Sequence, residues 1–284
     1  MFRKMLPILL ILTLVLTACD LHISLPVTQK SGPTITDQIT VPPPADPTQT
    51  TNLNLKFGAG ILKLRSGADG IVSGTATYNV SDFKPTVTAK GSNVSIEQGN
   101  WRLTGIPDIT NIKNEWELSL GSAPLALSID AGAYQAEYEL GGLALTNLTI
   151  SDGAADTRLN FASPNLAEMS LLSYSTGASN VSLTGLGNAN FASLEFNSGA
   201  GNYTLDFSGQ FQRNGSVHIS TGVSNLTLII PTGLPAQITM QGGLSNVTHD
   251  SNWTKSVNVY TQEGSGPQLT FVVVIGAGNL TITH

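Results

Sequence analysis

The sequence predicts an all-β fold, an elongated, single-handed β-solenoid of about 22-residue coils with stacked parallel sheets. Three observations predict it. A glycine recurs at a nearly constant spacing, the residues on both sides of it alternate between apolar and polar, and an asparagine often follows it. Because a strand with one buried face shows this period of two, each repeat is expected to supply two half-buried strand segments.

The recurring glycines set the register of the coils. From Gly132 to Gly243 the steps are 21, 24, 22, 23 and 21 residues. The fifth and third residues before each glycine are apolar in all copies, and the fourth and sixth after it are apolar except at Thr157 and His249. Since the two flanks are out of phase, we expect a corner at the second and third residues after the glycine. The eight glycines are Gly58, Gly132, Gly153, Gly177, Gly199, Gly222, Gly243 and Gly276.

An asparagine occupies the third position after the glycine in the last five copies. Asparagine tolerates the left-handed backbone of a corner, and stacked coils place identical side chains about 4.8 Å apart. We therefore expect a structural corner ladder of asparagines, and the Asn-x-Ser/Thr pattern is a by-product of the alternation rather than a glycan acceptor. The ladder residues are Asn180, Asn202, Asn225, Asn246 and Asn279.

Residues 1–18 are expected to be a lipoprotein signal peptide. Arg3 and Lys4 precede a short apolar run, and the following Leu16-Thr17-Ala18-Cys19 resembles the bacterial lipobox. In that motif the cysteine becomes the lipidated first residue of the mature protein. We expect a diacylglyceryl-Cys19 that holds the protein on the extracytoplasmic face of the cell membrane. A plain signal peptide with an incidental cysteine is the alternative.

The remaining chain divides by composition. Residues 19–50 carry the anchor cysteine and a Pro/Thr-rich stretch with few large apolar groups, so we expect a disordered spacer. Residues 51–113 contain their own alternating runs and are expected to form an N-terminal β segment continuous with the β-solenoid repeats of residues 114–284.

Composition excludes several function classes. The formal net charge is −6, which disfavours nucleic-acid binding, and Cys19 is the single cysteine, which excludes a disulfide framework and a thiolate metal site. Charged residues make up 11% of the chain, against about 25% in an ordinary domain. No pair of carboxylates recurs on neighbouring coils, so we expect no enzyme, no metal and no cofactor, and a carbohydrate-active enzyme ranks last.

The segments Leu53–Gln98 and Asn114–Ala133 resemble the bacterial toast-rack domain family. The later Gly-Ala-Gly-Asn copies are similar to the β-solenoid half of that family, of LiaF-type cell-wall-antibiotic-response proteins and of related adhesin-type domains. The resemblance implies the fold, and it implies no catalytic residue. The LiaF-type relatives are membrane proteins that act with sensor kinases in envelope stress, whereas this chain carries a lipobox.

The step from Gly243 to Gly276 contains an insertion, which solenoids often use for binding. Its chemically varied residues form a possible binding loop: His249, Asp250, Trp253, Lys255 and Tyr260. The alternative is a longer loop whose aromatic rings cover the end of the core.

The sequence thus predicts a lipid-anchored, non-enzymatic interaction module, with a role in envelope stress sensing, or alternatively an adhesin or glycan-binding surface protein. The expected partners are the membrane, through the lipid on Cys19, and an envelope protein or a second copy. The apolar segment 269–284 is expected to end the stack as an uncovered coil that pairs with that copy or partner.

Overall fold

The computed structural model describes residues 31–99 and 111–284. Regular structure in these ranges consists of β-strands and two short 3₁₀ helices, η3 (Ser81–Phe83) and η5 (Leu186–Asn188). The larger of two compact units, residues 32–101 and 112–284, holds all the described strands. The smaller unit, residues 1–31 and 102–111, falls almost wholly outside the described ranges.

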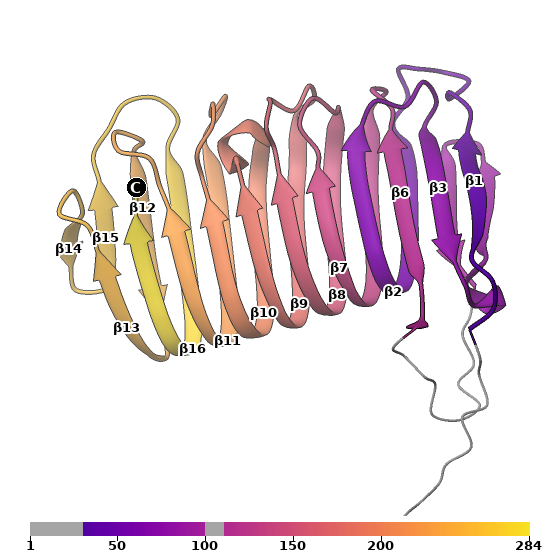
Figure 1. Ribbon diagram of the computed structural model, residues 1–284. Coiled ribbons are helices and arrows are strands. Elements are labelled where there is room, and N and C mark those ends of the chain that lie inside the picture. Colours follow the sequence, from indigo (N-terminus) through magenta and orange to yellow (C-terminus); the bar gives the residue numbers. More distant parts are fainter. Residues whose placement is uncertain (1–30, 100–110) are drawn as a thin grey trace, which may run out of the picture. The chain divides into compact units, whose positions relative to one another are not determined.

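Long bent strands form the body of this larger unit. They stack in parallel and in register, each turning back at its glycine, so that the sheet folds into two layers with the hydrophobic core between them (Figure 1). The solenoid of parallel coils expected from the repeat is therefore confirmed. The long strands are β2 (Thr51–Ser66), β7 (Leu125–Glu139), β8 (Leu145–Asn160), β9 (Met169–Thr184), β10 (Phe191–Asp206), β11 (Gly215–Ile229) and β16 (Leu269–Thr283).

The bend lies earlier than the sequence suggested. In β10, Gly199 and Ala200 are both exposed, the next residue is half-buried, Asn202 is exposed and Tyr203 is buried. The phase of the alternation therefore changes at the glycine and the residue after it, and the predicted corner at the asparagine was wrong. A Cβ on Gly199 would lie 2.5 Å from the backbone oxygen of Gly177 on the neighbouring coil, so the stacked bends need glycine because the backbones approach so closely.

The asparagine ladder itself is confirmed. Asn202 donates to Asn180 over 3.0 Å, Asn225 donates to Asn202 over 3.0 Å, and Asn279 donates to Asn225 over 2.8 Å. Asn246 lies in register beside Asn279. The row runs along the outer face of the second layer, one residue before a buried position, rather than around the bend.

Shorter strands flank the stack at the β2 end, where two of them run parallel to β2 and the pairs beyond these are antiparallel. In the first layer β2 pairs with β5 (Asn93–Gln98), which pairs with β4 (Pro85–Lys90). In the second layer β2 pairs with β6 (Asn114–Leu120), which leads to β3 (Val72–Tyr78) and then β1 (Ile35–Val41).

One of the expected segment boundaries changes. β1 lies inside the predicted spacer of residues 19–50, so that prediction was wrong for these seven residues. Alternation in this strand buries Ile39 and Val41 against the core, although proline and threonine dominate the composition around it. The described part of residues 51–113 is continuous with the solenoid, as expected, because β2 pairs with β7 along nearly its whole length.

The C-terminal coil is not the uncovered end that the sequence suggested. One edge of β16 pairs with β11, and its other edge pairs with β12 (Ala236–Gln241) and β13 (Leu244–His249). β12 pairs in turn with β15 (Val259–Gln262) and β15 with β14 (Thr254–Ser256). The last strand of the chain is thus an inner strand of the sheet (Figure 1).

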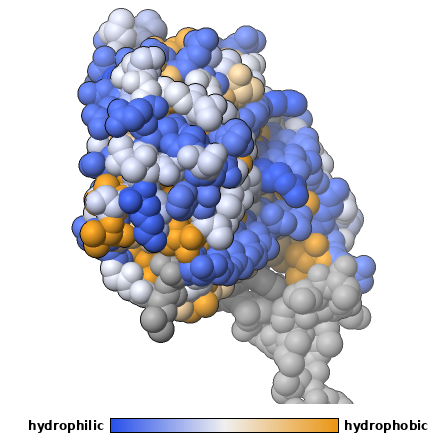
Figure 2. Space-filling view, turned by 90° about the vertical axis from the view of Figure 1, so that its left-hand side faces the viewer, coloured by the Kyte–Doolittle hydropathy of each residue, from blue (hydrophilic) through white to orange (hydrophobic). Residues whose placement is uncertain are grey.

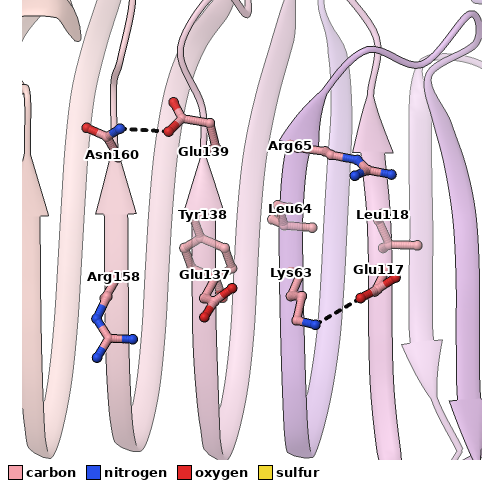
Figure 3. Close-up of a pocket in the computed structure, with 10 residues that line it drawn as sticks. All are labelled: Lys63, Leu64, Arg65, Glu117, Leu118, Glu137, Tyr138, Glu139, Arg158 and Asn160. Carbon is pink, nitrogen blue, oxygen red and sulfur yellow. Dashed lines mark hydrogen bonds and ion pairs between the residues drawn. The ribbon is translucent and has the colours of Figure 1, made fainter.

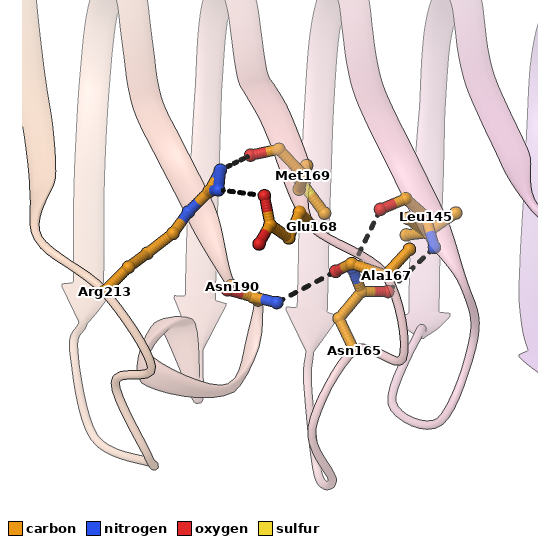
Figure 4. A network of polar contacts seen from close by, with 7 residues as sticks. All are labelled: Leu145, Asn165, Ala167, Glu168, Met169, Asn190 and Arg213. Atoms are coloured by element: carbon orange, nitrogen blue, oxygen red, sulfur yellow. Dashed lines mark hydrogen bonds and ion pairs between the residues drawn. The ribbon is translucent and has the colours of Figure 1, made fainter.

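Side chains tie the loops between coils together (Figure 4). The Asn165 amide donates to the backbone oxygens of Leu145 and Ala167 and accepts from the Leu145 backbone N–H. Arg213 reaches back to the Met169 oxygen over 2.8 Å and to the exposed Glu168 carboxylate over 3.0 Å. These bonds fix the loops of successive coils relative to one another.

Candidate functional site

A group of charged side chains lies on the outer face of the second layer, over β6, β2, β7 and β8. The pairing of these strands places Glu117, Lys63, Glu137 and Arg158 in one row across the sheet. A second row, two residues further along each strand, contains Ser119, Arg65, Glu139 and Asn160. These residues, with Glu115, are the charged face. All of them except Ser119 and Glu115 border a shallow depression of about 350 Å³ (Figure 3).

Part of the charged face is neutralised internally. Lys63 Nζ lies 2.7 Å from Glu115 and 2.9 Å from Glu117. These bonds raise the pKa of the Lys63 ammonium above its usual value, and the Lys63 contact lowers the pKa of Glu117. Glu139 accepts a 2.7 Å bond from Asn160 and further bonds from backbone N–H groups of the following loops. Lys63, Glu117 and Glu139 therefore have defined positions.

The other charges are not neutralised in this way. Within the described residues, neither Glu137 nor Arg158 has an ion pair or side-chain hydrogen bond, although the two face each other on adjacent strands. Arg65 donates from Nε to Ser119 over 3.2 Å, and within the described residues its two terminal nitrogens have no hydrogen bond. The charged face thus offers a carboxylate and two guanidinium groups, exposed and close together, to a ligand with charges of both signs.

The first of these two rows is neutral beyond β8. The row that contains Lys63, Glu137 and Arg158 continues across the sheet as Ser182, Thr204, Thr227, Thr281 and Thr248, beside the asparagine ladder. The change from charged to neutral side chains occurs between β8 and β9. Within this row, charge is thus confined to the coils nearest the N-terminal strands.

The sequence reasoning did not single out the charged face. The signal was available, because Lys63, Glu137 and Arg158 all stand five residues after their glycines, at a position that the alternation directs outward. Aligning the outward positions of the copies, as well as the inward ones, places these charges side by side.

A second polar group is enclosed in the core. Asp152 is buried and accepts bonds from Tyr174 over 2.7 Å, from the hydroxyl of Thr176 and from Tyr134 over 3.4 Å. Burial raises the pKa of Tyr134 to about 12 and that of Tyr174 well above its usual value. Because this carboxylate lies under the bend and bonds to hydroxyls of neighbouring coils, it connects β7, β8 and β9.

The predicted binding loop divides into buried and exposed residues. Trp253 and Tyr260 are only 4% and 2% exposed, so their rings cover the end of the core, as the alternative interpretation held. His249 lies edge-on to the Tyr260 ring at 5.3 Å, and Lys255 Nζ lies 5.3 Å from the same ring centroid. Figure 2 faces this end of the stack, and its surface is mainly hydrophilic with small apolar patches.

Asp250 turns away from that ring. Its Oδ2 accepts a 2.9 Å bond from Thr283 and lies 2.7 Å from Nδ1 of His284, so it attaches the chain terminus to the loop. The Thr283 hydrogen bond, followed by that of His284, lowers the pKa of Asp250. The structure does not bring the five loop residues together around one accessible cavity, and their binding role stays a prediction.

Cys19 and the signal peptide lie outside the described residues. Across residues 31–99 and 111–284 no helix is long and apolar enough to span a bilayer. In the same ranges no three His, Cys, Asp or Glu side chains are grouped in a way that could hold a metal ion.

Comparison with known families gives the identity of the fold. The family model described as the N-terminal domain of toast_rack, DUF2154, matches residues 30–171 and 167–229, which is more than half of the chain. The chain belongs to this family. The match confirms the predicted resemblance to the toast-rack family. The matched residues include those of the charged face.

Two solved structures are similar to this chain at low identity. A proposed cell adhesion protein from Clostridium sporogenes is 19% identical with a TM-score of 0.50, over 88% of this chain and 99% of that one. A proposed adhesin from Bacteroides fragilis is 11% identical with a TM-score of 0.37, over 89% and 98% of the two chains. Comparison with curated proteins gives no match.

Proposed function

We propose that this toast_rack protein is a lipid-anchored, extracytoplasmic interaction module without enzymatic activity, and that its charged face binds a protein of the cell envelope. The lipid on Cys19 holds the module at the membrane, and the two-layer stack presents the charged face on a rigid support. A role in envelope stress sensing follows if the bound protein is a sensor, as the resemblance to LiaF-type proteins implies.

The observation that carries this proposal is the arrangement of Glu137, Arg158 and Arg65. An exposed cation that faces a carboxylate on the neighbouring strand can pair with it, as Lys63 does with Glu117. Arg158 stands beside Glu137 without a bond between them, so both groups are available to a partner. Exposed guanidinium groups and carboxylates at fixed spacing give orientation and specificity to a protein contact more than they give affinity.

A binding role also accounts better than catalysis for the chemistry of the site. The carboxylates of the charged face stand on an open surface, where water competes for every proton transfer. The buried carboxylate of Asp152 is already bonded to hydroxyls, and it lies inside the core, away from any substrate.

A second candidate is an adhesin that binds glycan. The neutral part of the outer face favours it, because the rows of asparagine and threonine offer amide and hydroxyl groups at regular intervals. The Clostridium sporogenes structure, whose name proposes cell adhesion, has the same fold. In that case replacing Asn225 and Thr227 by alanine should weaken binding to insoluble wall glycan, whereas changes to the charged face should not.

The test is a crosslinking pull-down of the lipidated protein from its host envelope. The protein, Arg65→Glu with Arg158→Glu, and the unanchored Cys19→Ala variant are compared. Lys90→Glu, on the exposed edge strand β4, is a control that reverses one charge in the other layer.

We expect one envelope protein to be recovered with the unmodified chain and with Lys90→Glu, and to be lost in the other two variants. Equal recovery with Arg65→Glu and Arg158→Glu would show that the charged face is not the binding surface. Recovery of wall glycan in place of a protein would favour the adhesin.

A further inference from the structure

The C-terminal strand β16 lies out of sequence order. The chain builds β11, then β12 and β13, then the hairpin of β14 and β15, and only afterwards places β16 between β11 and the β12–β13 pair. Every other long strand from β7 to β11 lies beside the long strand that precedes it in the sequence. β16 therefore lies between two sheet edges that precede it in the sequence, the edge of β11 and the edge of the β12–β13 pair.

These two sheet edges agree in the spacing of their glycines and in their register. Gly222 of β11 and Gly243 before β13 are 21 residues apart, the same step as between the directly stacked Gly132 and Gly153. The register of β11 also matches that of β13, because Asn279 of β16 lies opposite Asn225 of β11 on one side and opposite Asn246 of β13 on the other. β12 and β13 thus have the spacing and the register to stack directly on β11 when β16 is withdrawn.

Withdrawal of β16 is therefore less costly than removal of an inner strand from an ordinary sheet. Two interfaces are lost, and one new interface, between β11 and the β12–β13 pair, can replace part of them. A withdrawn β16 cannot stay in water, however, because its apolar side chains are fully buried in the stack: Leu269, Phe271, Val273, Ile275, Leu280 and Ile282.

The space in a second copy of the chain matches β16 in every contact. It offers the same backbone partners, the same buried neighbours and the same asparagine ladder as the strand's own position. Because the exchanged strand makes the same contacts in either copy, strand exchange loses few contacts. It requires mainly a hinge that can open.

The segment before β16 is suited to be that hinge. Residues 263–268, Glu-Gly-Ser-Gly-Pro-Gln, connect β15 to β16. Gly266 has a φ of +100° and nothing within 4 Å of the position of a Cβ, so it lies in open space. Extended, these residues reach on the order of 20 Å, which is several strand spacings.

We propose that β16 is an exchangeable coil, and that two copies of this chain associate by each inserting β16 between β11 and the β12–β13 pair of the other. This proposal goes beyond the function of the charged face and does not depend on it. It also replaces the expectation of an uncovered C-terminal edge, since association now uses the inner position of β16.

The test uses single cysteines on one outward row of the sheet. Thr204, Thr227 and Thr281 occupy this row on β10, β11 and β16, and Thr227 lies directly opposite Thr281. In the full chain with Cys19→Ala, one preparation carries Thr227→Cys and another carries Thr281→Cys. The two are mixed at high concentration, left to exchange and then oxidised.

We expect a disulfide-linked dimer that contains one chain of each kind. The control mixes Thr204→Cys with Thr281→Cys. After exchange these two cysteines lie two strand spacings apart, about 9.6 Å, which is too far for a disulfide. The double variant Thr227→Cys with Thr281→Cys, oxidised as a monomer before mixing, checks the fold and locks β16 in its own chain, so it should not dimerise.

The proposal is overturned if the mixed dimer of the Thr227 and Thr281 variants forms no more than in the Thr204 control. It is also overturned if the locked double variant dimerises as readily as the unlocked chain, because β16 then takes no part in association.

Discussion

Replacing Asp152 by alanine tests whether the buried polar group connects the coils. The carboxylate accepts bonds from Tyr174 and Thr176 on β9 and a longer one from Tyr134 on β7. Hydrogen bonds to a charged acceptor contribute about 1.5–3 kcal/mol each. After the substitution Thr176 keeps its 2.5 Å contact with Ser179, which offsets part of the loss.

We therefore expect Asp152→Ala to lower the free energy of unfolding by about 2–4 kcal/mol, a large share of the 5–15 kcal/mol typical of a domain. Asp152→Asn keeps one acceptor oxygen and should lose roughly half as much. The assay is equilibrium unfolding in urea, followed by circular dichroism, with the slope compared between variants.

Asp156→Ala is the matched control, because Asp156 lies on the same strand but is exposed. Its substitution should change the free energy of unfolding by no more than about 0.5 kcal/mol. If Asp152→Ala is as mild as Asp156→Ala, the buried carboxylate does not hold β8 and β9 together and the reasoning is refuted.

Three further predictions concern the stack. Gly278→Ser should destabilise the protein by at least about 1–3 kcal/mol in thermal and urea unfolding, because its φ is +140° and a Cβ would lie 1.8 Å from a backbone oxygen of the next coil; a neutral result would contradict the register. Asn225→Ala should cost about 1–2 kcal/mol through its two ladder bonds, and Thr227→Ala beside it clearly less; equal losses would deny the ladder a role. Burial raises the pKa of Tyr134 to about 12 and that of Tyr174 further, so stability should be intact below pH 10 and fall as pH rises toward and beyond 12; unchanged urea midpoints between pH 9 and pH 11.5 would contradict this.

Local pattern was sufficient to predict the repeat. Buried positions such as Leu194, Phe196 and Tyr203 follow from the alternation, and the asparagine ladder follows from one recurring residue. The exact residue of the bend did not follow, because a change of phase between two alternating runs can be placed at any residue between them. The bend lies where two successive residues are exposed, the glycine and the residue after it, and not at the asparagine.

Long-range pairing was beyond the sequence. The place of β16 between β11 and β12 depends on contacts between strands that are far apart in the chain, and the repeat alone suggests simple sequential stacking. β1 escaped notice because its alternation is short and lies in a Pro/Thr-rich stretch. Trp253 and Tyr260 looked like a binding surface, since composition cannot distinguish aromatic rings that close a core from rings that contact a ligand.

The most direct test of the proposed function is site-specific photo-crosslinking in the host envelope. A photoreactive residue is placed at Ser182, which borders Arg158 on the charged face, or at Thr281, on the neutral part of the same outer face. We expect Ser182 to capture one envelope protein, Thr281 to capture none, and Arg158→Glu to abolish the capture at Ser182. Equal capture at both positions, or capture at Ser182 that survives Arg158→Glu, would contradict a charged face that binds a partner.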